Sequence, residues 1–368
     1  MAIILMQDWR RYGVKNDIAN FEDSVTVRAS YVGWTAGGSV TLTGAAGRTG
    51  DQVIDIGSTS AQILTMKMPI NGTVWAASTV IISMMFKYVA DATSKISSGS
   101  TPIIELQGAS SQIQFKVHLD GGGTVLVESN AGAVVAVSPH AIQPGVWHNI
   151  EFKVSLADSG SFSMKVDNVL LINAASGDFK GDAGTATFVH LALSGNSDCW
   201  YDKILIADSS GSYNNDWLGD FRMEMALPTA NGGTTGWTAS AGSQYQCIDD
   251  AIGFSSGSSG SGYGADYIST STLNAISQFT MGTISASNYS SILFCGLYHI
   301  ARSDTTGDSI AGVCKSSATT GLGATMPLLG TTDAWYCWRR SYFERDPNGS
   351  IAWTPTAINA AEFGVKKL

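Results

Sequence analysis

The chain has 368 residues, enough for two domains, and combines 44% hydrophobic residues with only 14% charged ones. Its net charge of −9 argues against nucleic-acid binding, and its densest basic stretch, 339–345, is interrupted by acidic residues. No apolar run reaches the roughly 20 residues that span a bilayer, so the composition also argues against a membrane protein.

The N-terminal run 1–6 is apolar, has no basic residue before it and is shorter than the core of a secretion signal. It is therefore predicted to form a first β-strand, and the chain is expected to be made and folded in a cytoplasm. Five widely spaced cysteines without a C-x-x-C pair are typical of reduced thiols buried on strands. Neither they nor the five scattered histidines have the spacing of a metal site, and no cofactor motif is present.

Strand signals dominate the first half of the chain. Residues 78–88 are β-branched and aromatic and too apolar on both faces for an edge strand. Residues 113–119 alternate at period two, a glycine-rich turn follows at 120–123, and 124–128 returns, which predicts a hairpin. The further predicted strands are 149–156, 161–166, 169–173, 187–194 and 199–207. Their short, regular spacing indicates a jelly-roll sandwich and not βαβ units.

A domain boundary is predicted in the polar, turn-forming run 208–216. Residues 221–227 alternate again and are expected to open the second domain, which continues with strands at 292–301, 310–315 and 334–343. A short C-terminal helix is predicted with Thr354 as N-cap, Pro355 first, 357–363 as its body and Gly364 ending it. The predicted fold is all-β, with a jelly roll at 1–212 and a second, smaller β-sandwich at 213–368.

Two linked stretches carry a first resemblance. The segment 145–154 contains a turn, Trp147-His148 and a strand, and 160–170 is a strand that reaches Val166-Asp167-Asn168-Val169. This pattern resembles the laminin-G and concanavalin A-like jelly-roll family, and 200–206 is similar to the closing strand of those domains. The resemblance implies that Trp147 packs under the sheet and that the Asp167 turn forms a hairpin. It says almost nothing about function.

A second resemblance covers most of residues 200–368. The segment 214–222 reads N-N-D-x-L-G-D-x-R, and the chain ends with D-P…W-T at 346–354 and E-F-G-V at 362–365. The pair resembles a family of tailed-bacteriophage virion proteins with a jelly-roll N-terminal domain. It implies a structural protein located in the virion and made in the host bacterial cytoplasm. Independently of any family, 346–349 is a turn, and Trp353 can pack under the following helix.

The acidic residues and histidines are the candidates for catalytic chemistry. Jelly-roll glucanases carry E-x-D-x-x-E or E-x-D-x-E on one strand, and no such run exists here. The adjacent Asp249 and Asp250 would point to opposite faces of a strand. The remaining acids and histidines are interpreted as outward-facing strand residues and structural imidazoles: Glu105, Glu128, Glu151, Glu224, His118, His148, His190 and His299. No catalytic residue is assigned, and the chain is not expected to be an enzyme.

Calcium and glycans are the remaining ligand classes. Asp158, Asp167 and Asp202 could supply oxygens to calcium, but no D-x-D-x-D-G loop exists, so ordinary turn residues are the better interpretation. Four tryptophans lie near Gly- or Thr-rich segments where an indole could stack on a sugar: Trp34, Trp75, Trp217 and Trp237. The alternative is that the ten tryptophans fill cores and interfaces. Trp34 and Trp75 are taken as the candidate glycan-binding residues.

These observations leave two functions open. The first is a non-enzymatic virion structural protein, a head decoration or a head or tail fibre component, that contacts other virion proteins and forms a homo-oligomer such as a trimer. The alternative is a tail-associated, receptor-binding, lectin-like protein that recognises host glycans. The position in the particle, the oligomeric order and the interface residues stay open.

Overall fold

The computed structural model divides the chain into two compact units, Met1–Met223 (unit 1) and Glu224–Leu368 (unit 2). Each unit is treated by itself. The division lies after Met223, whereas the predicted domain boundary lies after residue 212. The structure describes residues 3–7, 33–37, 40–43, 53–56, 62–67, 78–88, 102–107, 112–119, 122–181, 190–195, 199–249, 266–285, 291–301, 303–305, 307–328 and 337–368.

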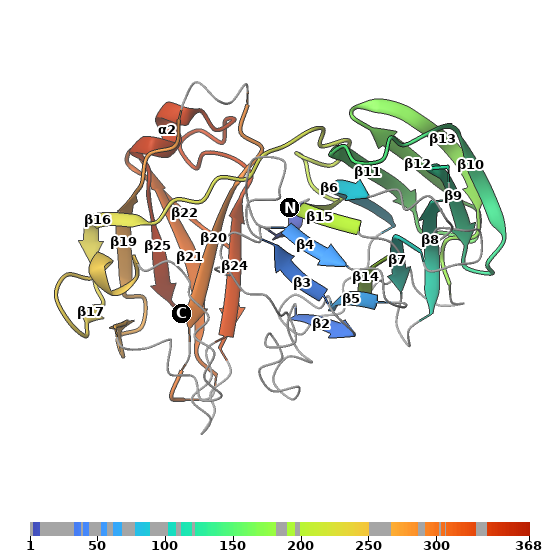
Figure 1. Cartoon of the computed structure of the whole chain (residues 1–368). Coiled ribbons are helices and arrows are strands. Elements are labelled where there is room, and N and C mark those ends of the chain that lie inside the picture. Colours follow the sequence, from blue (N-terminus) through green and yellow to red (C-terminus); the bar gives the residue numbers. More distant parts are fainter. Residues whose placement is uncertain are drawn as a thin grey trace. The chain divides into compact units, whose positions relative to one another are not determined.

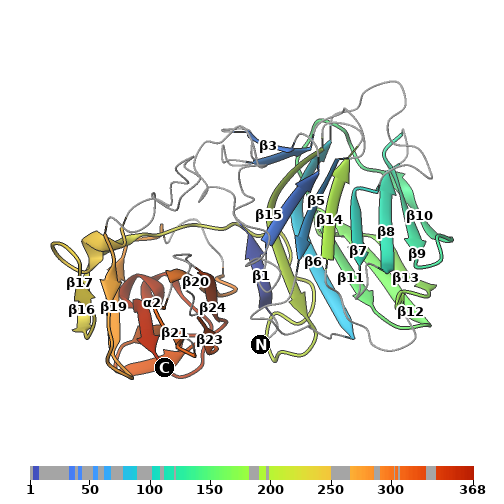
Figure 2. The same ribbon diagram turned by 90° about the horizontal axis from the view of Figure 1, so that it is seen from below.

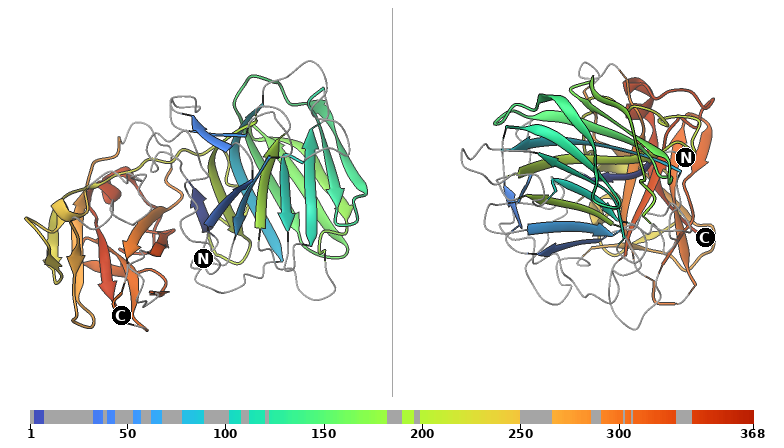
Figure 3. Two further views of the ribbon diagram at one scale, coloured as in Figure 1. Left: turned by 60° about the horizontal axis from the view of Figure 1, so that its bottom comes forward. Right: turned by 90° about the vertical axis from the view of Figure 1, so that its right-hand side faces the viewer.

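Unit 1 is built from two antiparallel sheets that face each other, as predicted for a jelly roll (Figures 1 and 2). The eight-stranded sheet has the spatial order β13 (Val169–Gly177), β12 (Gly160–Val166), β11 (His148–Ser155), β6 (Thr79–Tyr88), β15 (Cys199–Asp208), β4 (Val53–Ile56) and β3 (Val40–Thr43), with β1 (Ile3–Gln7) paired to β15. The seven-stranded sheet has the order β10 (Val134–Ala141), β9 (Thr124–Ser129), β8 (Ile113–Leu119), β7 (Ile104–Gln107), β14 (His190–Gly195), β5 (Gln62–Lys67) and β2 (Gly33–Gly37). Figure 3 shows the same two layers from two further sides.

The core of unit 1 lies between the sheets because alternate residues of each strand point inward. Phe152 of β11 pairs in register with Ile82 of β6, and both are fully buried. Phe115 of β8 meets Phe162 of β12 edge to face, with ring centroids 5.7 Å apart. The Phe115–Phe162 contact joins the two sheets. The strands predicted around each of these residues are therefore confirmed.

The outer face of the eight-stranded sheet is not simply a solvent face. Ile81, Ser83 and Met85 of β6 point away from the core and are nevertheless buried. β6 is flanked by β11 and β15, which confirms that it is not an edge strand. Residues 213–223, which we call the crossing segment, attach to β11 on this face. The burial of β6 on both sides explains why its sequence is apolar on both faces.

The hairpin of β12 and β13 turns at Asp167 and Asn168, whose φ angles of 50° and 66° belong to a type I′ turn. The Asp167 carboxylate accepts a 2.9 Å hydrogen bond from the Asn149 N–H, and its other oxygen lies 2.7 Å from His148 Nδ1. The predicted hairpin is thus confirmed and tied to the start of β11. Trp147 is half-buried, with its ring 6.4 Å from that of Trp200.

Unit 2 is also an all-β unit, with a six-stranded antiparallel sheet and two short strand pairs (Figure 1). The sheet order is β16 (Pro228–Thr235), β19 (Ile276–Met281), β25 (Glu362–Lys367), β21 (Ser309–Ser316) and β22 (Thr319–Leu322), with β23 (Met326–Pro327) paired to β21. The pairs are β20 (Cys295–Ala301) with β24 (Cys337–Phe343), and β17 (Thr238–Ala239) with β18 (Ile268–Ser269). The helices are the 3₁₀ turn η4 (Tyr245–Cys247) and α2 (Pro355–Ala360).

The core of unit 2 joins the six-stranded sheet to the β20–β24 pair. Trp353 is buried, donates from Nε1 to the Phe343 carbonyl at 2.9 Å, and has its ring 6.2 Å from that of Phe363. Cys295 and Leu297 of β20 pack on the same cluster. The prediction that Trp353 packs under the following helix is confirmed, because Ala357 and Ile358 of α2 lie against the same cluster.

Two sequence predictions for residues 221–368 need correction. Helix α2 begins as predicted, with Thr354 Oγ1 accepting the Ala357 N–H at 3.1 Å, but it ends at Ala360. The following residues form β25 in the middle of the sheet, and a Cβ on Gly364 would lie 1.9 Å from the Ser277 carbonyl oxygen. Gly364 therefore permits close strand packing and does not end a helix.

The second correction concerns 221–227, which forms no strand, since β16 begins at Pro228. Phe221 and Met223 are buried while Arg222 and Glu224 are exposed, so the alternation reflects one-sided burial without ladder hydrogen bonds. Among the described cysteines, Cys199, Cys247 and Cys314 are buried free thiols, although Cys247 lies in η4 and not on a strand. No described helix has the length and apolarity needed to cross a membrane.

Candidate functional site

The outer face of β11 and β12 carries a row of polar side chains because the alternate positions fill the core. Lys153 pairs in register with Ser163, and Glu151 pairs with Lys165. Ser155 and Ser161 continue the two rows toward the end of the hairpin. Asn173 of β13 lies beside them, so three neighbouring strands present hydroxyl, amide and ammonium groups on one face.

The crossing segment is fixed to this face by its backbone and by an ion pair. The N–H groups of Leu218 and Gly219 donate to the two carboxylate oxygens of Glu151, the Gly219 bond measuring 3.3 Å. Two residues after Glu151 in β11, Lys153 Nζ lies 2.7 Å from Asp216 Oδ1. Gly219 has a φ of +76°, a conformation that favours glycine. The segment therefore crosses β11 at a defined register.

Glu151 is the buried anchor of this arrangement. Its side chain is fully buried, and burial raises the pKa of its carboxyl group above the usual value, although the two backbone N–H donors oppose that shift. The exposed Asp216 behaves in the opposite way, because its hydrogen bond to Lys153 lowers its pKa. The sequence correctly predicts that Glu151 points outward from its strand. It does not predict that another segment covers it.

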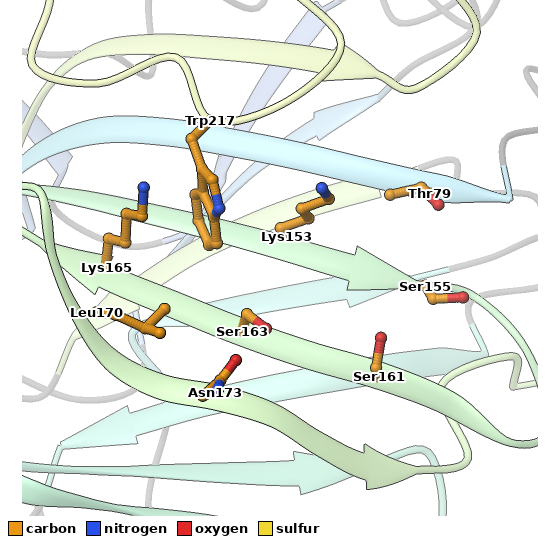
Figure 4. Close-up of a pocket in the computed structure, with 9 residues that line it drawn as sticks. All are labelled: Thr79, Lys153, Ser155, Ser161, Ser163, Lys165, Leu170, Asn173 and Trp217. Atoms are coloured by element: carbon orange, nitrogen blue, oxygen red, sulfur yellow. The ribbon is translucent and has the colours of Figure 1, made fainter.

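Between the crossing segment and the strands lies a groove of about 360 Å³. In Figure 4 the Trp217 ring stands between Lys165 on one side and Lys153 on the other, above Ser163. Lys165 Nζ lies 4.4 Å from the centre of the Trp217 ring, a cation–π contact. The groove is lined by Thr79, Lys153, Ser155, Ser161, Ser163, Lys165, Leu170, Asn173 and Trp217.

The chemistry of this lining suits recognition of a hydroxyl-rich ligand. An indole supplies a flat apolar surface, while serine, threonine and asparagine side chains donate and accept hydrogen bonds. Among the described residues, no carboxyl, imidazole, thiol or phenol group lines the groove. The described lining can bind and orient a ligand.

The four tryptophans considered from the sequence lie in different parts of the structure. Trp217 lies in the groove. Trp237 belongs to unit 2, where its Nε1 donates to the Ala275 carbonyl at 3.1 Å. Trp34 lies in β2, where its backbone is paired with that of Met66 in β5. Met66 is paired in turn with Leu191 of β14, and Leu191 with the buried Leu106 of β7. The Trp34 side chain and the whole of Trp75 lie outside the described residues, so their role in glycan binding stays a prediction.

The three aspartates considered for calcium do not come together. Asp158 lies 3.5 Å from Lys180, Asp167 2.7 Å from His148, and Asp202 2.9 Å from Lys203. Across the described ranges no group of three or more His, Cys, Asp or Glu residues is arranged to hold a metal ion. The lysine and histidine contacts give each aspartate an ordinary structural partner.

A second polar row crosses the outer face of the seven-stranded sheet. Glu105 of β7 lies 3.8 Å from Lys116 of β8, and His118 Nε2 lies 3.2 Å from Glu128 Oε2 of β9. These acids are isolated in the sequence and are brought together only by strand pairing. His190 lies in β14, and its side chain lies outside the described residues. His299 lies on β20 in unit 2, remote in sequence from either row.

Comparison with solved structures finds jelly-roll domains at low sequence identity. The cellulose-induced protein Cip1 is 12% identical, with a TM-score of 0.37, over 55% of this chain and 97% of its own. An endo-β-1,4-glucuronan lyase from the fungus Trichoderma reesei is 11% identical, with a TM-score of 0.38, over 56% and 95%. The Emp46p carbohydrate recognition domain is 10% identical, with a TM-score of 0.33, over 54% and 97%. At these values the likeness concerns the fold alone. No protein-family model and no curated protein matches the sequence.

Proposed function

We propose that the chain is a non-enzymatic carbohydrate-binding protein and that the groove beside Trp217 is its binding site. The observation that carries this proposal is the position of the Trp217 ring above a floor of serine, threonine and asparagine side chains (Figure 4). A sugar ring presents an apolar C–H face and a rim of hydroxyl groups, which match the indole and the floor respectively.

Rigidity supports the same proposal. Trp217 stands directly before Leu218 and Gly219, whose N–H groups bond to Glu151, and directly after Asp216, which pairs with Lys153. The indole is therefore held on both sides along the chain, and little conformational entropy is lost when a ligand stacks on it. Such preorganisation is what a weakly buried sugar site needs.

The test is titration of the full chain with a glycan array, followed by calorimetry on the strongest glycan. Trp217→Ala is expected to lower the affinity at least ten-fold, because the stacking surface is lost. Trp147→Ala is the matched control, since Trp147 is also half-buried and precedes β11 by one residue, roughly 20 Å from Lys153 at about 3.3 Å per residue. Equal loss in both variants, with unchanged melting temperatures, would contradict the assignment of the groove.

A second candidate function is the virion structural role predicted from the sequence resemblance. β10 and β13 are the end strands of their sheets and contact each other, and neither contains a charged residue. They expose Val134, Val137, Val169 and Leu170. An uncharged apolar edge of this kind favours permanent contact with another chain. Mass spectrometry of purified phage particles, giving copies per capsid protein, tests it; absence from the particles would reject it.

A further inference from the structure

The groove differs in charge from the rest of the chain. The sequence has 30 acidic and 21 basic residues, yet the described residues that line the groove include two lysines and no carboxylate. A ligand that enters it meets ammonium groups although the molecule as a whole is negative. The positive charge of the residues that line the groove is therefore a local property of this site.

The two lysines are not equivalent. Lys153 is paired with Asp216 at 2.7 Å, so its charge is largely compensated. Lys165 lies within 4.0 Å of no carboxylate of the described ranges, although its charge acts on Glu151 and Asp216, and its Nζ rests over the Trp217 ring. Glu151 is its cross-strand neighbour, but both oxygens of Glu151 already accept backbone N–H groups of the crossing segment. Lys165 is thus the cation with bonding capacity left for a ligand.

We propose that the groove takes an acidic saccharide, whose anionic group is bound by Lys165 while its ring lies against Trp217. This inference rests on the proposed carbohydrate function and narrows its ligand class. The floor residues Ser161, Ser163 and Asn173 then meet the sugar hydroxyls. A charge-assisted bond from Lys165 discriminates between acidic and neutral sugars of the same configuration.

The experiment uses pairs of tetrasaccharides that differ only in charge. Tetrauronates of gluco, manno and galacto configuration are each compared with their carboxyl-reduced products, and a sulfated galactan tetrasaccharide with its desulfated form. Calorimetry on the full chain at about 50 mM salt is expected to give at least ten-fold tighter binding for an acidic member of one configuration or class. That preference is expected to shrink at about 500 mM salt, since exposed charges are screened.

Substitutions of Lys165 test whether this lysine causes the preference for acidic over neutral tetrasaccharides. Lys165→Gln is expected to reduce it to less than two-fold, and Lys165→Arg to retain it. Lys116→Gln is the matched control, because it changes the net charge equally on the other sheet, where Lys116 pairs with Glu105. Equal affinity for acidic and neutral members of every pair would overturn this proposal while leaving carbohydrate binding intact. Failure of every tetrasaccharide to bind would overturn both.

Discussion

Unit 1 and unit 2 each enclose an ionisable side chain in a β layer, and they satisfy it differently. Glu151 of unit 1 is buried as the acceptor of two backbone N–H groups from the crossing segment. His299 of unit 2 has a buried Nε2 without a hydrogen-bond partner among the described residues, and burial lowers its pKa to about 4. Glu151 fastens a segment that carries a candidate ligand residue, whereas the buried Nε2 of His299 binds no described residue.

The difference predicts opposite responses to acid. The pKa of Glu151 is raised in the folded state, so its contribution to stability is fully present below about 4.5 and is lost as the pH rises through its folded pKa. The pKa of His299 is lowered, so its contribution is present above about 6.5 and is lost as the pH falls toward 4. Protonation of Glu151 in mild acid therefore relieves the cost of burying its charge, although the two N–H bonds favour the carboxylate, whereas protonation of His299 weakens its packing. Of these two groups, His299 is the one at which acid lowers stability.

The largest expected effect is that of removing the anchor in unit 1. Glu151→Leu leaves the Leu218 and Gly219 N–H groups without their acceptor, which costs about 3 kcal/mol of unfolding free energy. Because Trp217 precedes these residues, glycan binding in the groove is expected to be lost as well. Urea unfolding and hydrogen exchange of peptides covering 213–223 measure the two effects.

Glu151→Gln is the matched variant for this prediction. Its amide oxygen can still accept one of the two N–H groups, so about half of the stability loss is expected to remain. Full exchange protection of 213–223 in Glu151→Leu would contradict the role of Glu151 as anchor. It would mean that the burial of Leu218, Phe221 and Met223 alone holds the segment.

Most of the fold could be predicted from the sequence because strand periodicity is a local property. The alternation in 113–119 and the apolar run 78–88 give β8 and β6 almost to the residue. The end of the chain shows the limit of such reasoning. Ala361 to Gly364 continues a plausible helix pattern, but pairing of β25 with both β19 and β21 outweighs local propensity.

The candidate site could be predicted only in part, because it depends on a tertiary contact. Trp217 stands out in the sequence as one of four tryptophans near turn-forming residues, but nothing local places it over β12. Lys153 and Lys165 lie at outward positions of their strands, which the alternation does reveal. What joins the three is the hydrogen bonding of 218–219 to Glu151, across 67 residues of sequence. No pattern within either segment encodes that pairing.

A smaller effect is expected from acid on unit 2. With a pKa of about 4 in the folded state and about 6.5 when unfolded, His299 is expected to reduce the stability of unit 2 by up to about 2 kcal/mol between pH 7 and pH 5. Denaturant-dependent hydrogen exchange of peptides covering 295–301 measures this, with 148–155 of unit 1 as the internal reference. His299→Gln removes the titrating group, so its β20 peptides are expected to show no such loss. If the wild-type and His299→Gln peptides lose equal stability, the acid sensitivity arises from another group, and the contrast between the two units would no longer rest on these two side chains.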